Sequence, residues 1–405
     1  MKLKWLHREH KQSEIRTYLT GLVTGALFCL AVLLILQFVS GVPVLFSSSL
    51  TKEVAKKTQE AQSYIDKYYW KSDLNQEKLA DYAIKGMVSA LGDKYSDYYT
   101  TSEYNQAMGE VKGDYTGIGA TIYMDTSTKQ KIIRKVQESS PAEEAGLKVD
   151  DVLLKINGED ISQKSLNDTV SMIRGKEGKT SKLTIQRKEQ DKTKVMEVTV
   201  TAKKLVNQSI HYKMLTGKKG YINISNFDNE GVKQFQSAME DLKKQGMTGL
   251  VLDVRNNGGG SLEAVTKMLD ELLPEGVLLT EKYKNKEDVV YRSTDEKQFD
   301  KPIVVLINGG SASASEVMAG ALQDRKAATL VGVKSFGKGI VQSIFSLRFG
   351  GGIKLTTGQY LLPSGRCIHG TGLTPDVEVT YSGTSNELGG EDDNQLRKAL
   401  TVLEK

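Results

Sequence analysis

The sequence predicts a mixed α/β fold, and three features of its 405 residues support this class. Residues 205–382 alternate short apolar runs with amphipathic segments, the pattern of strands and helices packed in layers. Residues 113–190 instead indicate a small module with several strands. Helical patterns occupy residues 50–112, and a C-terminal helix is expected within residues 383–405.

The first 39 residues predict a membrane anchor. Residues 1–17 carry a net charge of +3, and residues 18–39 contain no Asp, Glu, Lys, Arg or His. As a helix, the second segment would be about 33 Å long, enough to cross a hydrocarbon core of about 30 Å. The positive flank favours a cytoplasmic tail at residues 1–17 and an external location for the rest. A cleaved signal peptide is the alternative, but its apolar core would be only about 7–15 residues long.

The composition of the chain limits which partners and cofactors are expected. The whole chain has a net charge of +5, of which residues 1–17 supply +3, so the body of the protein is close to neutral. This balance argues against nucleic acid as the main partner. The two cysteines, Cys29 in the anchor and Cys367 near the other end, do not form a disulfide framework. No metal or nucleotide motif is present, and we expect no cofactor.

Residues 50–112 predict amphipathic helices, because apolar side chains recur at helical spacing. This region would either cap the core or form an arm through which two copies of the chain associate. The recurring positions are Ala61, Tyr64, Ile65 and Tyr68 in one helix, and Leu79, Ala83, Met87 and Leu91 in the next.

Residues 113–190 predict an ordered series of short elements. Ser140 can cap a short helix that has Pro141 at its first position. Asn157 and Gly158 form a dipeptide typical of a tight hairpin turn. The series contains a glycine loop at 117–120, a strand at 132–136, the short helix, a strand within 150–158, a helix at 166–174 and a last strand at 181–187.

This order of elements resembles a PDZ domain. The resemblance implies that the loop Gly117-Ile118-Gly119-Ala120 holds the terminal carboxylate of a peptide, which adds as a strand to the sheet edge. Glycines in this loop let the backbone approach the carboxylate closely. Arg174, at the end of the following helix, is a candidate for relaying peptide occupancy to a catalytic site; a solvated charge is the alternative.

In the core, two predicted strands end in glycine-rich turns. The strand at 249–255 is followed by Asn256-Asn-Gly-Gly-Gly-Ser261, and the strand at 303–307 is followed by Asn308-Gly-Gly-Ser-Ala-Ser313. In layered α/β folds, ligand sites form at such carboxyl ends of strands. The other expected elements are a strand at 220–227 and helices at 231–245 and 315–325. A further helix is expected to follow the turn at 256–261 and to end at Leu273.

Ser313 and Lys338 are the candidate catalytic pair. Ser313 would lie where a strand turns into a helix, so that its hydroxyl is close to free N–H groups that stabilise an anion. Lys338 lies in a second glycine-rich turn, with Gln342 one helical turn beyond it. A lysine amine can accept the serine proton if burial lowers its pKa, and Ser-Lys pairs occur among hydrolases. A plain helix cap is the alternative for the small-residue run.

From about residue 55 to the end, the chain is similar to the C-terminal processing peptidases, also called tail-specific proteases. This resemblance implies a serine endopeptidase with a ClpP/crotonase-like core, an inserted PDZ domain and no cofactor. The motifs that carry it include Leu91-Gly-Asp-Lys-Tyr-Ser96, residues 252–259, Ser311-Ala-Ser-Ala-Ser-Glu316, Phe336-Gly-Lys-Gly339 and Gly372-Leu-Thr-Pro-Asp376.

The resemblance also implies a role for individual residues. In the family's pattern the nucleophile is the serine three residues before a glutamate, here Ser313 before Glu316. Lys338 would be the general base, and the amide of Gln342 would hold its amine in position. The N–H groups implied for the oxyanion are those of Ala314 and of either Gly258 or Gly259.

We therefore predict a bacterial, single-pass membrane protein whose catalytic part lies outside the cytoplasm. Its PDZ domain would bind the free C-terminus of a protein, and its core would cleave near that tail through an acyl-enzyme. The main alternative is a non-catalytic PDZ scaffold that presents peptides to a membrane partner. An acyl-CoA enzyme and a Ser-His triad through His369 have less support. No wall-binding module is expected after Leu400.

Overall fold

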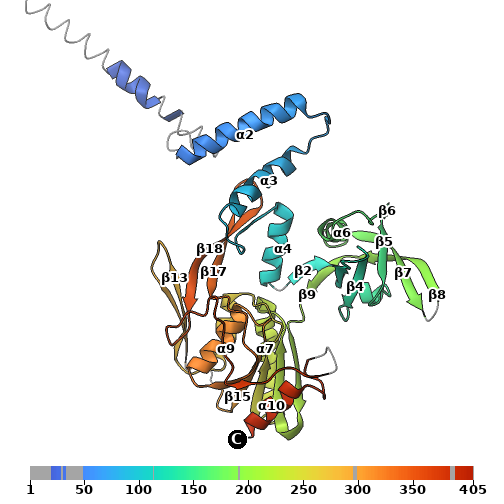
Figure 1. The fold of residues 1–405 in the computed structure, drawn as a ribbon, viewed down its shortest axis with the longest axis vertical. Coiled ribbons are helices and arrows are strands. Elements are labelled where there is room, and N and C mark those ends of the chain that lie inside the picture. The colour runs from blue at the N-terminus through green and yellow to red at the C-terminus, as the bar shows by residue number, and fades with distance from the viewer. Residues whose placement is uncertain are drawn as a thin grey trace, which may run out of the picture. The chain divides into compact units, whose positions relative to one another are not determined.

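The computed structural model describes residues 20–28, 31–32, 49–112, 114–189, 192–294, 299–383 and 388–404, and Figure 1 maps their elements. The described chain has a mixed α/β fold, as the sequence predicted. It divides into two compact units, residues 1–79 and 80–405, and each unit is described by itself.

The predicted membrane anchor at residues 18–39 lies largely outside the described residues. The structure describes 20–28 and 31–32 within it, all of them helical and exposed. Within the described part of the chain, no helix has both the length and the apolar character needed to cross a bilayer. The tail at residues 1–17 and Cys29 are also outside the described residues.

Helices dominate residues 49–112, as their apolar spacing predicted. The rings of Tyr64 and Tyr68 stack with their centroids 6.0 Å apart and are exposed, so this face of the helix has no cover among the described residues. A short strand in this region was not predicted. The elements are α2 (Ser49–Tyr68), α3 (Gln76–Ser89), β1 (Asp97–Tyr99) and α4 (Thr101–Lys112).

A strand-rich module follows, built on the sheet β3-β4-β5-β7-β8 with β6 paired to β5. Ser140 caps α5 by accepting a hydrogen bond from the Glu143 N–H, and Pro141 opens that helix, as predicted. The chain enters and leaves the module through an antiparallel pair, β2 (Asp114–Gly117) and β9 (Lys203–Val206). The other elements are β3 (Ala120–Met124), β4 (Lys131–Val136), α5 (Pro141–Glu144), β5 (Val152–Ile156), β6 (Glu159–Asp160), α6 (Leu166–Ile173), β7 (Thr180–Glu189) and β8 (Lys192–Thr201).

A six-stranded sheet forms the centre of the remaining chain, in the order β10-β11-β12-β15-β16-β19. Its pairs are parallel except for β10 with β11. The strands are β10 (Ile210–Leu215), β11 (Lys219–Ile224), β12 (Gly249–Asp253), β15 (Ile303–Ile307), β16 (Ala328–Gly332) and β19 (Val377–Glu378), and the 3-10 turn η1 (Thr216–Lys218) joins the first two.

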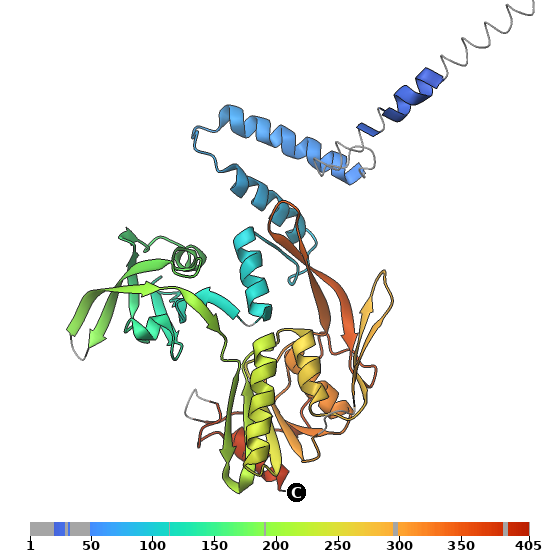
Figure 2. The same cartoon turned by 180° about the vertical axis from the view of Figure 1, so that it is seen from behind.

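Helices cover both faces of this sheet. Side chains alternate between the two faces along each strand, so a wholly apolar strand needs cover on both. Leu250 and Leu252 of β12 pack with the helices of one face, whereas Val251 packs with the helix of the other. The first face carries α7 (Asn229–Lys244), α8 (Leu262–Asp270) and α9 (Ala314–Asp324), and the second carries α10 (Asn394–Leu403), an arrangement that can be followed in Figures 1 and 2.

A second sheet, which the sequence did not predict, packs against α8 and α9. Its strands run in the order β1-β18-β13-β14, with β17 paired to β18. It brings β1, from the helical region, to the edge of β18. The strands not yet given are β13 (Gly276–Tyr283), β14 (Val289–Ser293), β17 (Ile340–Ser346) and β18 (Gly352–Leu361).

Candidate active site

Ser313 occupies a strained turn at the start of α9. Its backbone has φ 55° and ψ −116°, a conformation that costs a non-glycine residue about 1–3 kcal/mol. The turn follows β15 directly and places Ser313 in the wall of a cavity of about 640 Å³. Ser313 thus lies at a helix N-terminus, as the sequence predicted, and is half-buried.

Three serines share this turn, but their hydroxyls differ in availability. The Ser311 hydroxyl donates to the backbone carbonyl of Val254, and the Ser315 hydroxyl donates to that of Asn257, each at 2.8 Å. Both side chains are fully buried. The Ser313 hydroxyl donates to no group among the described residues; it faces the Glu316 N–H in the capping box that opens α9, and Ser313 is half-buried at the cavity wall. Of the three, Ser313 is therefore the one that a substrate can reach.

Lys338 lies in the loop before β17 and lines the same cavity as Ser313. Burial lowers the pKa of its amine, the neighbouring Lys354 lowers it further, and the carboxylates of Asp93 and Glu316 oppose the change. A lowered pKa increases the fraction of neutral amine, the form that accepts a proton. Among the described residues, no hydrogen bond joins the Lys338 amine to the Ser313 hydroxyl.

Gln342 bonds to Lys338, although it lies in a strand and not one helical turn beyond the lysine. The prediction of a helical relationship was wrong, because residues 340–346 pair with β18. A register shift between Val341 and Gln342 marks a bulge, the device by which strands re-aim a side chain. The amide oxygen of Gln342 accepts from the Lys338 amine at 3.0 Å, and its nitrogen donates to the Tyr95 carbonyl at 2.8 Å.

Tyr95 is a component of the site that sequence reasoning missed. The Lys338 nitrogen lies 5.1 Å from the centroid of its ring, within reach of a cation–π attraction. The same ring also meets the His369 ring edge-on, with the two centroids 6.4 Å apart. The motif Leu91–Ser96 was recognised in the sequence, but nothing in it indicated that Tyr95 contacts the lysine. His369 does not line the cavity.

Glu316 ties the serine turn to the lysine turn. Its side chain is fully buried, and one carboxylate oxygen accepts from the N–H of Ser313 at 3.0 Å and from that of Lys338 at 2.8 Å. The other oxygen accepts from the N–H of Gly337 and the hydroxyl of Ser335. Four donors around one carboxylate compensate its burial. The sequence had indicated Glu316 only as a marker of motif spacing.

Tyr360 contacts the same two turns through their carbonyl groups. Its hydroxyl lies 2.5 Å from the Lys338 oxygen and 3.2 Å from the Ser313 oxygen. Burial raises the pKa of Tyr360 well above its usual value, so the hydroxyl keeps its proton and remains a donor. No motif indicated this residue.

Gly258 and Gly259, the two candidates for binding the oxyanion, differ in whether their backbone N–H group is already hydrogen-bonded. The Gly259 N–H donates to the side-chain oxygen of Asn257 at 2.8 Å, whereas the N–H groups of Gly258 and Ala314 have no partner among the described residues. Gly258 and Ala314 also line the cavity. Gly259 instead has φ +114°, and a Cβ there would lie 2.8 Å from the Ser313 Cβ. Gly259 therefore permits close packing, and Gly258 has the available donor.

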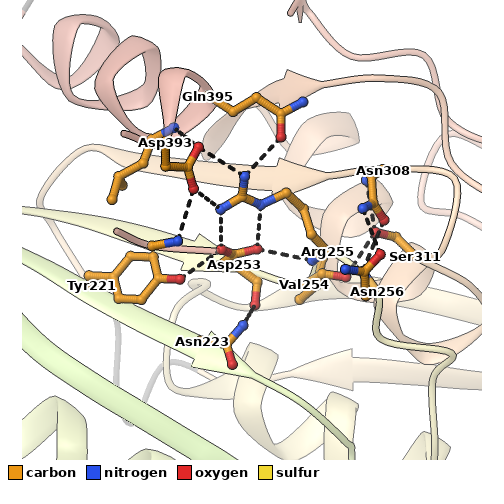
Figure 3. Close-up of polar contacts among 12 residues, drawn as sticks. Tyr221, Asn223, Asp253, Val254, Arg255, Asn256, Asn308, Ser311, Asp393 and Gln395 are labelled. Carbon is orange, nitrogen blue, oxygen red and sulfur yellow. Dashed lines mark hydrogen bonds and ion pairs between the residues drawn. The ribbon is translucent and has the colours of Figure 1, made fainter. Parts of the chain in front are cut away.

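A buried ion network surrounds Arg255, the residue directly before the glycine loop (Figure 3). The Arg255 guanidinium bonds to both oxygens of Asp253 and of Asp393, and to the side chain of Gln395. Burial opposes the charge of Arg255, but its bonds to the two carboxylates raise its pKa. The Tyr221 hydroxyl adds a 2.7 Å bond to Asp253. The network joins the end of β12 to the start of α10.

The two glycine-rich turns are also tied to each other, as Figure 3 shows in part. The side-chain oxygen of Asn308 accepts from the Asn256 N–H at 2.9 Å, and its nitrogen donates to the Asn256 side chain at 2.8 Å. The Asn257 carbonyl accepts from the Ala312 N–H at 3.0 Å. These bonds explain why both turns carry Asn before their glycines.

The predicted peptide-binding loop lines a different cavity, of about 930 Å³. Gly117, Ile118, Gly119 and Ala120 all contribute to its wall, as does Arg174. Among the described residues, the N–H groups of Ile118 and Gly119 have no hydrogen-bond partner. Gly119 has φ +80°, and a Cβ there would lie 2.3 Å from the side chain of Ser140, so the loop requires glycine.

The described residues contain no group of three or more His, Cys, Asp or Glu side chains that could hold a metal ion.

Comparisons with known proteins identify the chain as a serine peptidase. Residues 218–379 match the model of peptidase family S41, residues 132–187 match a PDZ domain, and residues 45–102 match the N-terminal domain of the activating protease CtpB. The chain belongs to family S41 and, within it, to the CtpA-like C-terminal processing proteases. The family predicted from the sequence is confirmed.

Individual relatives support this assignment. The chain is 35% identical over 363 residues to a probable CtpA-like serine protease of Staphylococcus aureus strain COL, covering 89% of this chain and 71% of that protein. A protein of the same description from Staphylococcus saprophyticus is 36% identical over 399 residues, covering 95% and 79%. Among solved structures, a photosystem II D1 C-terminal processing protease matches with a TM-score of 0.50 and 27% identity, over 83% of this chain and 89% of that one.

Proposed function

We propose that this peptidase attacks peptide bonds with the Ser313 hydroxyl, uses the Lys338 amine as its general base and forms an acyl-enzyme. One observation carries the proposal: a serine hydroxyl that donates to no other described group and a lysine of lowered pKa line the same cavity. The family assignment makes a serine nucleophile the expected chemistry.

In the proposed first step, the neutral Lys338 amine takes the proton of the Ser313 hydroxyl as the oxygen attacks the substrate carbonyl carbon. The carbonyl oxygen gains a negative charge, which the N–H groups of Ala314 and Gly258 are free to stabilise. The tetrahedral intermediate then collapses. The lysine ammonium returns the proton to the leaving amine, and the acyl group stays on Ser313.

Hydrolysis of the acyl-enzyme follows the same route in reverse. Lys338 takes a proton from water, the resulting hydroxide attacks the ester carbon, and the proton is returned to Ser313 as the acid product leaves. Gln342 accepts one N–H of the amine. This bond leaves the nitrogen lone pair for the serine proton, so Gln342 acts as a positioning residue.

The substrate class follows from the module at residues 113–190. We propose that the loop Gly117–Ala120 captures the terminal carboxylate of a protein, since its unpaired N–H groups line a cavity beside α6. Cleavage would then occur near that tail. Arg174 lines the same cavity and is our candidate for relaying its occupancy to the catalytic turns.

Residues 18–39 are proposed to anchor the chain in a bacterial membrane, with the catalytic part outside the cytoplasm, because the segment is uncharged and follows a positive tail. The exposed aromatic side chains Tyr64, Tyr68 and Trp70 support a second proposal, that the helical region pairs two copies of the chain. Protease accessibility of the tail in sealed vesicles tests the first, and mass photometry in detergent tests the second.

The catalytic proposal is tested with the full-length chain in detergent and its Ser313→Ala variant. Each is incubated with an unfolded protein, and the fragments are identified by mass spectrometry. We expect cleavage near the C-terminus by the wild-type protein and none by the variant. A serine-directed acylating probe should label Ser313 in the wild type. No cleavage and no labelling would instead favour a PDZ scaffold.

A further inference from the structure

A buried carboxylate that takes no part in the proposed reaction lies in the wall of the active-site cavity. Glu281, in β13, is 4% exposed and lines the cavity of Ser313 and Lys338. A buried carboxylate is costly unless its oxygens find donors or cations. The Glu281 carboxylate is therefore expected to bind a donor or a cation within the cavity.

Strand pairing places Glu281 beside the catalytic turns. Glu281 of β13 is opposite Tyr360 of β18 in an antiparallel pair. Residues opposite one another in such a pair project from the same face of the sheet. Since the Tyr360 hydroxyl contacts the carbonyls of Ser313 and Lys338, the Glu281 side chain leaves the sheet on the face that carries these turns.

Two tyrosines fix the Glu281 side chain and leave one of its oxygens available. The hydroxyls of Tyr283 and Tyr291 donate to the same oxygen, Oε2, at 2.6 and 3.0 Å. Burial and the Glu281 carboxylate raise the pKa of Tyr291 to about 12, so it remains a donor. Among the described residues, no donor bonds to the second oxygen, Oε1. Oε1 is thus an acceptor without a donor among the described residues.

Several apolar side chains line the cavity that Ser313 and Glu281 share. Val317 lies one turn beyond Ser313 on α9, and residues of α8 and β17 complete the wall. Lys354 also lines the cavity, but it is six residues from Tyr360 along β18, about 20 Å in an extended strand. Lys354 is therefore well separated from Glu281 along the sheet. The apolar side chains are Phe227, Leu262, Val317, Ile340 and Val341.

We propose that Glu281 closes a specificity subsite for a long cationic side chain, lysine or arginine, on the substrate residue whose carbonyl Ser313 attacks. The aliphatic stem of such a side chain would pack on the apolar wall, and its charged end would bond to Oε1 of Glu281. This inference rests on the proposed function, because the subsite is defined relative to the Ser313 nucleophile in the same cavity.

The test uses full-length protein in detergent and three fluorogenic peptides that differ only at this residue, with lysine, norleucine or glutamate. Norleucine keeps the aliphatic stem and lacks the charge. For the wild type, kcat/KM for lysine should exceed that for norleucine about tenfold or more, with glutamate the poorest. In Glu281→Gln the lysine-to-norleucine ratio should fall to about one.

Glu287→Gln, the same substitution at an exposed position of the β13–β14 hairpin, is the matched control and should keep the wild-type ratio. If Glu281→Gln unfolds at the assay temperature, the lysine-to-norleucine ratio of the wild type alone tests the subsite. A wild type that cleaves all three peptides without preference overturns the subsite and leaves the proposed reaction intact. If the wild type cleaves none of the peptides and is not labelled at Ser313, both the subsite and the proposed reaction are overturned.

Discussion

Glu316 and Tyr360 hold the same two residues by opposite ends of their peptide groups. Glu316 accepts the N–H groups of Ser313 and Lys338, and the Tyr360 hydroxyl lies within bonding distance of the carbonyl oxygens of both. The two turns that carry the proposed nucleophile and base are therefore fixed relative to each other by an acid from α9 and a tyrosine from β18.

Glu316→Gln should lower kcat/KM by about a hundredfold or more and lower stability by about 1–3 kcal/mol, because the amide nitrogen would face N–H donors in place of a carboxylate oxygen. Peptide kinetics and urea unfolding measure the two effects. Glu263→Gln, at an exposed position on α8, is the control. Full activity in Glu316→Gln would contradict the positioning role.

Tyr360→Phe should reduce kcat about tenfold while changing KM little, because it loosens the turns without altering the apolar wall. Steady-state kinetics separate the two constants. Tyr212→Phe, which removes an exposed hydroxyl bonded to Asp241, serves for comparison. A rise in KM at constant kcat would mean that Tyr360 contacts substrate instead.

The rate should depend on pH through Lys338. Burial lowers the pKa of this amine, and only its neutral form accepts a proton. The value of kcat/KM should therefore rise with pH and level off at a pH below the ordinary lysine pKa of about 10.4. Lys338→Ala should lose activity at every pH while keeping its melting temperature near that of the wild type. A profile still rising above pH 10.5 would argue against a perturbed lysine.

Gly259→Ala should lose at least a hundredfold in activity. The added Cβ would lie 2.8 Å from the Ser313 Cβ, at a φ of +114° that side chains rarely adopt. Gly258→Ala meets no atom within 4 Å and should lose much less, since it keeps its N–H. Equal losses would show that the loop tolerates no side chain anywhere, and the distinction between the two glycines would fail.

Asp393→Asn should destabilise the fold by about 3–5 kcal/mol, because it leaves Arg255 partly unpaired in the interior. Guanidinium unfolding gives the value. The exposed neighbour Glu391, changed to Gln, should stay within about 0.5 kcal/mol of the wild type. A loss below about 1 kcal/mol would mean that Asp253 alone compensates the arginine.

The sequence predicted elements whose signals are local. The strand at 303–307 was predicted residue for residue, because five consecutive apolar residues are bounded by a proline and by glycines. Ser140 and Pro141 likewise indicated the helix that they begin. In contrast, β8 was missed, since its first residues are lysine-rich and its alternating apolar residues begin only at Met196.

The proposed catalytic pair was found by motif, but its surroundings were not. Tyr95, Glu281 and Tyr360 reach the site from strands or loops that are adjacent to it only through the pairing of β1, β13 and β18. Such pairing leaves no trace in the spacing of residues along the chain. Gln342 was assigned a helical position because four-residue spacing suggests a helix, whereas a bulged strand gives the same contact.

The Arg255–Asp393 pair has a consequence for the order in which the protein matures. The two residues are 138 positions apart, and the ribosome makes Arg255 first. Until Asp393 is synthesised, the guanidinium has Asp253 as its carboxylate partner and lacks its second ion pair. An incomplete chain should thus be a poor protease and should reach full activity only when its last helix has packed against the sheet.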